Sequence, residues 1–487
     1  MTATSETTSS ISAAALKIPY ELTARIFLLC LPRDRRVRPS PKSAPLLLAQ
    51  ICGDWRALAI SVPELWNSIH LDFLHRVRYD GISALFGVDT YPVPAPIVQL
   101  SDSWFTRAAG LPLSITICCA DFGMSLPEGL ITLIMAKFTQ WGRLELRISR
   151  RDLAAFHHPG PFPMLQTLAI DVTDVRGLAW NQSMFCCAPN LQALRLGAPL
   201  WGTFRLPMAP GPPTSVTALD FCLDCMGVTP EFFRPLGHFP NLRHLKISSR
   251  RIGYRYLSFI VAIPRLETLF VKHSPILLNH LQIPTLRHLG IFLFSDIDAT
   301  TITSFLTRSA CMLTHLTLRA PGGDRWCDYF HLTGRPCNSS ALLKCLEAVP
   351  SVVDISLAGD EALYSPFHRG DILPRLHTLR FTSWPSTTVH AAFLAVLRAR
   401  PALQSADLHL LHRAGEVTPP PNNDVLADLS IYAAGGIHIN LTTQSVGRSY
   451  MEFKANTEEC EESIEGYDLF APDSPLPRGF APFKYQC

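Results

Sequence analysis

A short phrase of the form Pro-x-Leu-x-x-Leu-x-apolar recurs along most of this 487-residue chain and constrains its fold more than any other feature. Successive copies are about 20 to 27 residues apart, a spacing typical of stacked repeat proteins. The first apolar positions of ten copies are Leu165, Leu191, Val216, Leu242, Leu266, Leu286, Leu313, Val352, Leu376 and Leu403. The copies at Val216 and Leu313 lack the proline. Only the step from Leu313 to Val352 is clearly longer. We therefore expect an elongated array of repeats.

Each phrase predicts one short strand. In Leu245-Lys246-Ile247 the two apolar residues alternate with a polar one, so both point into a core while Lys246 points out. Helical return segments are expected between phrases, at Tyr254–Ala262, Thr301–Ser309, Ala341–Ala348 and Thr388–Arg398. One unit buries too little apolar surface to offset the entropy of ordering it, so the units must stack. The predicted fold class is an α/β solenoid with a parallel sheet. Weaker phrases at 113–117, 144–148 and 437–441 are expected to begin and end it.

The segment from residue 16 to residue 70 has a different pattern. Pro19 suits the first turn of a helix, where its missing N–H has no partner to lose. Leu22, Ile26 and Leu29 recur at i, i+4 and i+7, which predicts a helix with one apolar face. A second helix is expected after Pro45, with an apolar face made of Leu48, Ile51, Cys52, Trp55, Leu58 and Ala59. Helices this short cannot build a large core, so a remaining apolar face should be covered by something else.

The order Ile18-Pro19-x-Glu21-Leu22-x-x-x-Ile26-Phe27, Ile51-Cys52-x-x-Trp55-Arg56-x-x-Ala59 and Pro63-x-Leu65-Trp66 resembles the F-box, in the form common in large fungal (basidiomycete) families. The resemblance implies docking on a Skp-type adaptor and, with a cullin, membership of an SCF-type ubiquitin ligase. It implies that the adaptor contacts are Ile18, Pro19, Leu22, Ile26, Phe27, Leu48 and Ile51. Trp55 and Trp66 are expected mainly in the core of the segment. The alternative is an ordinary helical cap on a larger domain.

Two departures from the F-box pattern stand out. Ile18 replaces the commoner Leu, and the basic stretch from Pro32 to Pro45 lengthens the first loop. A loop of this length would weaken docking if it folded over the surface that faces the adaptor.

The repeat phrases themselves resemble leucine-rich repeats, in the irregular form that often follows an F-box. The Asn or Cys that regular repeats carry three residues after the last apolar position is missing here. The expected organisation is a disordered N-terminus (1–15), an F-box-like helical module (16–70), a helical linker (71–110), the solenoid (111–445) and an acidic, proline-containing tail (446–487). From Met451 to Cys487 the tail has eight acidic residues against three basic ones.

A partner would bind the exposed face of the parallel sheet, the usual binding surface of solenoids. The middle units are expected to expose a basic band with two aromatic residues, formed by His244, Lys246, Phe270, Lys272, His288, Phe292, His315 and Arg319. Such a band suits an acidic or phosphorylated segment of a protein substrate. The alternative is a solvated sheet face with no selected partner. The long spacer Ala320–Ser340 is a second candidate contact or a tolerated insertion.

Composition argues against several other classes. The net charge is +3, from 43 basic and 40 acidic residues, too balanced for a general nucleic-acid binder. No apolar run reaches the ~18 residues of a membrane span. The 14 cysteines, without a signal region, suggest reduced thiols in the cytoplasm or nucleus.

Signals for catalysis or metal binding are weak. Cys222 and Cys225 lack the second ligand pair that zinc needs, and Cys327, His331 and Cys337 lack a fourth ligand. No phosphate-binding or nucleophile motif is present. We therefore expect no metal, no cofactor and no catalysis. The leading hypothesis is a non-catalytic substrate-recognition subunit of a ubiquitin ligase, and the alternative is a repeat scaffold that binds proteins without ubiquitin transfer.

Overall fold

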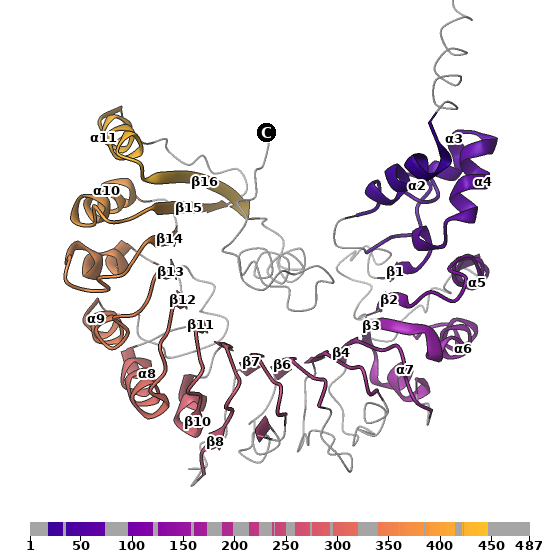
Figure 1. Ribbon diagram of the computed structural model, residues 1–487, viewed down its shortest axis with the longest axis horizontal. Coiled ribbons are helices and arrows are strands. Elements are labelled where there is room, and N and C mark those ends of the chain that lie inside the picture. Colours follow the sequence, from indigo (N-terminus) through magenta and orange to yellow (C-terminus); the bar gives the residue numbers. More distant parts are fainter. Residues whose placement is uncertain are drawn as a thin grey trace, which may run out of the picture. The chain divides into compact units, whose positions relative to one another are not determined.

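The structure is a computed structural model in which a long, open parallel sheet is combined with helices (Figure 1). The residues that it describes are 18–32, 36–73, 96–119, 125–156, 160–172, 188–197, 214–223, 236–237, 239–249, 259–272, 275–292, 296–319, 339–359, 361–383, 386, 388–413, 421 and 423–446. Among these residues the sheet has 14 strands. The predicted α/β class with a parallel sheet is therefore confirmed. The chain divides into two compact units, the second of which includes all residues from Val216 onward.

In its described residues the first unit has three helices followed by five sheet strands, with further helices between the strands. Its elements are α2 (Tyr20–Leu29), α3 (Leu48–Ile51), α4 (Gly53–Ser61), η1 (Pro63–Leu65), β1 (Ser68–Asp72), α5 (Pro96–Arg107), β2 (Leu113–Cys118), α6 (Glu128–Met135), η4 (Phe138–Gln140), β3 (Trp141–Ile148), α7 (Arg150–Ala155), β4 (Thr167–Val172) and β5 (Ala193–Gly197). These strands pair in parallel in chain order.

Tryptophan side chains join the helices at the start of the chain to the sheet of the first unit. The buried Trp66 ring meets the Trp104 ring of α5 edge-on at 4.8 Å. The Trp66 indole donates a hydrogen bond to the carbonyl of Ala59 at 2.7 Å, and the Trp104 indole donates to the carbonyl of Ser68 at 2.9 Å. Because both polar ring atoms are satisfied, these large rings can be fully buried at no hydrogen-bonding cost. The helices and β1 therefore share one core.

The basic loop after α2 is held against the sheet of the same unit. The His70 amide of β1 donates to the carbonyl of Val37 at 2.8 Å. Arg38 lies 3.3 Å from a carboxylate oxygen of Asp72, and Arg36 lies 3.5 Å from Glu145 on β3. The described part of the long loop is therefore anchored to strands.

The second unit contains the remaining strands and the helices α8 to α11. Its elements are β6 (Ala218–Leu223), β7 (His244–Ser249), β8 (Val261–Ala262), β9 (Thr268–Lys272), η8 (Pro275–His280), β10 (Leu281–Gln282), β11 (His288–Phe292), α8 (Asp296–Ser309), β12 (His315–Arg319), α9 (Ser339–Glu347), β13 (Asp354–Ala358), η10 (Glu361–His368), β14 (Thr378–Ser383), α10 (Val389–Ala399), β15 (Ser405–Arg413), α11 (Asn423–Ala434) and β16 (His438–Val446). Here β8 and β10 form a separate two-stranded sheet. In Figure 1 the helices α8 to α11 lie on one side of the strands.

Where a repeat phrase carries its proline, the proline sits in a tight turn. The amide of Leu266 reaches the carbonyl of Ile263 across Pro264 at 3.4 Å, and the amide of Leu376 reaches Leu373 across Pro374 at 3.1 Å. Proline fits the second position of such a turn because its fixed φ matches the turn and its missing N–H is not needed there. The turn then delivers the chain into the next strand.

Side chains alternate along β14 as the sequence predicts. Leu379 and Phe381 of β14 are buried, and Phe381 meets Phe393 of α10 at 6.2 Å between ring centroids. Arg380, between them, contacts Asp354 and Asp407 of the neighbouring strands instead. The helix side of the sheet is therefore the core, and the other side carries polar residues.

Every strand predicted from a phrase is present, but three local predictions are wrong. The helix expected after Pro45 is interrupted at Cys52, whose backbone is extended and whose sulfur caps the next helix by accepting from the Trp55 amide. The helix expected at Tyr254–Ala262 is not found in its described part, residues 259–262, where Val261 and Ala262 form the strand β8. The sheet begins at Ser68, inside the segments assigned to the helical module and the linker, because β1 pairs with β2.

Several predicted features lie outside the described residues. These are the disordered N-terminus 1–15, Cys225, most of the spacer Ala320–Ser340 with Cys327, His331 and Cys337, and nearly all of the tail 446–487.

Candidate functional site

Helix α2 exposes an apolar stripe formed by Leu22, Ile26 and Leu29. Their exposed fractions are 54%, 43% and 80%. The helix starts directly after Pro19, whose carbonyl accepts from the amides of Leu22 and Thr23, and it buries only Thr23 and Phe27. Exposed apolar residues with helical spacing form a surface that another molecule can cover.

The predicted adaptor contacts separate into two groups. Ile18, Pro19, Leu22, Ile26 and Ile51 are exposed, whereas Phe27 and Leu48 are buried. Phe27 is fully enclosed and packs against Trp55 at 4.9 Å between ring centroids. The prediction that Phe27 and Leu48 face a partner is therefore wrong, because the chain itself buries both side chains.

Sequence reasoning also missed exposed residues beside the stripe. Tyr20 and Leu47 are exposed, as is Ile60 on α4. Tyr20 follows Pro19 directly. A large aromatic residue at the first helical position is the sequence signal that could have identified Tyr20 as part of the exposed surface. The anchored loop leaves Leu22 and Ile26 exposed, so the described part of the loop does not cover the stripe.

The predicted basic band lies on the polar side of the second unit's sheet, but it differs in detail. Phe270 and His288 are buried rather than exposed. The Phe270 ring lies over Gly290 of the neighbouring strand, where a Cβ atom would come within 2.0 Å of the ring. His288 meets this ring edge-on at 4.8 Å. The missing side chain at Gly290 thus lets the phenyl ring lie down against the sheet.

The other members of the band stay near the surface. Lys246, Lys272, His244, His315 and Arg319 are partly exposed. Lys246 lies 3.9 Å from a carboxylate oxygen of Asp220 on the adjacent strand. The side chain of Phe292 lies outside the part of the structure that can be described.

The histidines contribute no positive charge to this surface at neutral pH. Burial lowers the pKa of His288 to about 3, with a smaller effect from the nearby His315. Burial also lowers the pKa of His244 and of His315, although Asp354 opposes the effect at His315. The ring of His288 is held by Thr317, whose hydroxyl lies 3.2 Å from its Nε2. The positive charges of the band are therefore those of Lys246, Lys272 and Arg319.

Next to this band, one arginine forms ion pairs with two carboxylates. Arg380 lies 3.1 Å from Asp354 and 3.3 Å from Asp407. Burial raises the pKa of both aspartates, and the charge of Arg380 only partly offsets it. The arrangement is a cross-strand ion-pair ladder.

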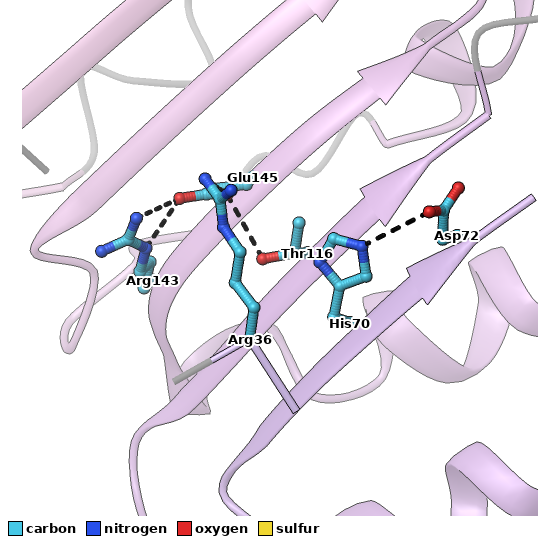
Figure 2. A network of polar contacts seen from close by, with 6 residues as sticks. All are labelled: Arg36, His70, Asp72, Thr116, Arg143 and Glu145. Atoms are coloured by element: carbon cyan, nitrogen blue, oxygen red, sulfur yellow. Dashed lines mark hydrogen bonds and ion pairs between the residues drawn. The ribbon is translucent and has the colours of Figure 1, made fainter. Parts of the chain in front are cut away.

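The first unit carries the opposite arrangement, in which several cations surround one carboxylate. Figure 2 shows Arg36 and Arg143 approaching Glu145 on β3, with Thr116 of β2 donating to the same carboxylate at 3.3 Å. Burial would raise the pKa of Glu145, but Arg143 and Arg36 hold it below its ordinary value. This network ties the loop after α2 to β2 and β3.

Among the described residues, no group of three or more His, Cys, Asp or Glu is placed to hold a metal ion. Cys222 lies on the polar side of β6, and its predicted partner Cys225 is not described. No described helix is both long and apolar enough to cross a membrane.

Comparison with known proteins adds no assignment. No protein-family model matches the sequence, and a search of curated proteins gave no match. The functional argument therefore rests on the residues themselves.

Proposed function

We propose that this protein is a substrate-recognition subunit of an SCF-type cullin-RING ubiquitin ligase. In this proposal the α2 to α4 segment is an F-box that docks a Skp-type adaptor, and the stacked units are irregular leucine-rich repeats that bind the target protein. The protein is assigned no catalytic step, and it would work in the cytoplasm or nucleus.

The exposed apolar stripe of α2 is the observation that supports this proposal most. Three large apolar side chains at i, i+4 and i+7 are exposed to solvent, although Phe27 of the same helix is fully buried. Covering them would remove apolar surface from water, with about 1.5–3 kcal/mol for each fully buried side chain. A partner with a complementary apolar surface would therefore obtain most of its binding free energy from this part of the segment.

The arrangement of the first unit also supports the proposal. Trp66 is hydrogen-bonded to Ala59 of α4 and packs on Trp104, which is hydrogen-bonded to Ser68 of β1. The Arg36–Glu145 ion pair joins the loop after α2 to β3. A docking segment joined in this way would be carried in a fixed orientation on the strands of its own unit.

Co-purification with a Skp-type adaptor tests the proposal. The wild-type chain should recover adaptor and cullin, and the double variant Pro19→Ala with Leu22→Asp should lose most of that recovery. Ile431→Asp, which changes another exposed apolar residue on α11, is the matched control and should bind normally. Equal recovery of adaptor by wild type and double variant would remove the proposal and leave the repeat scaffold as the better description.

A further inference from the structure

We propose that the end of the second unit formed by β16 and α11 is the interface for a second copy of this chain. In this dimer the two copies of β16 pair antiparallel across a two-fold axis, so that their sheets join into one and their α11 helices lie on the same side of it. The proposal does not rest on the proposed function.

The core residue that β16 contributes is less covered than its counterparts on the neighbouring strands. Leu441 is in register with Leu408 of β15, which continues the row formed by Phe381 of β14 and Leu357 of β13. Those three side chains are at most 1% exposed, whereas Leu441 is 37% exposed. Among the described residues no further unit stacks on Leu441, although the last unit of a repeat stack normally has a polar outer face.

Helix α11 continues this apolar surface above the strand. Asp428 of α11 pairs with Arg398 of α10, and Leu429 is buried. Leu426 lies about 200° around the helix from Asp428, so it faces away from α10, and it is 45% exposed. The exposed residues of this flank are Asn423, Leu426, Ser430 and Ala433. The flank therefore brings no charge to the end of the unit.

The strand β16 also presents backbone groups that another strand can pair with. Within the described part of the chain it pairs with β15 alone and is the last strand of the sheet (Figure 1). The His438 amide donates to the carbonyl of Gln404 at 2.8 Å, so by alternation Ile439, Leu441 and Thr443 direct their backbone groups away from β15. The strand contains no Lys, Arg, Asp, Glu or Pro, the residues with which edge strands usually prevent pairing.

A second copy fits this edge because the strand is complementary to itself. In an antiparallel pair centred on Asn440, Ile439 lies opposite Leu441 of the second copy, and Leu441 lies opposite its Ile439. These are residues with outward backbone groups, so each pair can exchange both backbone hydrogen bonds. Their apolar side chains meet on the core side. The two Asn440 side chains meet on the polar side, where each amide can donate to the other's carbonyl oxygen.

The end of the unit is large enough for a weak dimer. The nine residues of β16 span about 30 Å, and the sheet and helix layers together are about 20 Å deep. The end face is therefore about 600 Å² per copy, or about 1,200 Å² in total, which is the lower limit of standard specific interfaces. We expect a Kd on the order of micromolar, and little effect of salt because the face is uncharged.

Sedimentation of the full chain at about 0.5 to 100 µM tests this interface, and the dimer fraction should rise over that range. Leu441→Lys should raise the dimer Kd at least about tenfold, because it brings a charge into each apolar cross-strand pair. Leu426→Lys, which changes a more exposed side chain, should raise it at least about threefold. Ile431→Lys is the matched control, because Ile431 is exposed on another side of α11, and its dimer Kd should equal that of wild type.

Amide hydrogen exchange, resolved to single residues by mass spectrometry, tests the strand pairing itself. The outward amides of Ile439 and Leu441 should exchange at least about tenfold more slowly at 100 µM than at 0.5 µM, whereas the inward amide of Thr442 should be protected at both concentrations.

A chain that stays monomeric throughout would overturn the proposal, as would a dimer that Leu441→Lys and Leu426→Lys leave intact. Protection of the outward amides in the monomer would assign the edge to another segment of the same chain and would also overturn it. Co-purification of the adaptor should be the same in wild type and in these variants, so failure here is separable from failure of the proposed function.

Discussion

Helices α2 and α10 are similar in length and in apolar content, but they use their apolar residues in opposite ways. Helix α10 buries Val389, Phe393, Leu394, Val396 and Leu397 against the sheet and its neighbours. Helix α2 buries only Thr23 and Phe27 and leaves its apolar stripe in water. The repeat helix is part of the core of its unit, whereas most of the α2 face contributes nothing to the fold. This difference is what suggests a binding role for α2.

The largest expected effect is on stability. Phe393→Ala should lower the free energy of unfolding by about 3–5 kcal/mol, because it leaves a cavity beside Phe381 in a closely packed core. Leu22→Asp should change it by less than about 1 kcal/mol, because the side chain is already exposed. Guanidinium unfolding followed by circular dichroism measures both. A large loss of stability in Leu22→Asp would mean that the stripe belongs to the chain's own core.

The same contrast between buried and exposed residues holds for two arginines near the end of α10. Arg400 is buried and donates to the carbonyls of Phe367, Leu373 and Arg369. Arg400→Ala should cost about 2–3 kcal/mol, since it leaves buried carbonyl groups without a donor. Arg398→Ala, which removes a largely exposed ion pair with Asp428, should cost less than about 1 kcal/mol. Equal losses of unfolding free energy in the two variants would contradict this account.

The ion-pair clusters around Glu145 and Arg380 should change the free energy of unfolding in opposite directions as the pH falls. Arg143 and Arg36 hold the pKa of Glu145 below its ordinary value of 4.5. Its contribution to the free energy of unfolding is therefore complete above pH 4.5 and is lost as the pH falls through the lowered pKa. Burial holds the pKa of Asp407 above its ordinary value of 3.8, so protonation stabilises the folded state as the pH falls from that raised pKa toward 3.8.

Urea unfolding between pH 7 and pH 3 checks these signs. Glu145→Gln should cost about 1–2 kcal/mol at pH 7 and should flatten the loss of stability below pH 4.5. Asp407→Asn should make the loss steeper, because the opposing contribution is removed. Identical pH profiles for the two variants would show that the numbers of cations and carboxylates in each cluster do not set the pKa values.

The regular part of the fold could be read from the sequence because each phrase carries several agreeing signals. In Ile263-Pro264-Arg265-Leu266 the proline fixes the turn, and the alternation that follows fixes which side chains enter the core. Such local signals suffice for strands that repeat the same environment.

The rest depended on contacts that a periodic sequence pattern does not carry, most of them between residues far apart in the sequence. The interruption at Cys52 requires its sulfur to cap a helix, and cysteine is not a usual capping residue. The burial of Phe270 depends on Gly290 one strand away, and the neutral state of His288 follows from that burial. The exposure of Leu22 beside the burial of Phe27 depends on where Trp55 packs. A periodic pattern gives the apolar face of a helix but does not say how much of that face the chain itself covers.

The most direct test of the central claim is calorimetric titration of a purified Skp-type adaptor into the full chain. Wild type and Leu426→Asp, a matched change on α11, should bind with the same Kd, and Leu22→Asp and Ile26→Asp should each raise the Kd at least about tenfold, a loss of ~1.4 kcal/mol. Unchanged affinity in Leu22→Asp and Ile26→Asp, with normal unfolding curves, would contradict the assignment of the α2 stripe as the docking surface.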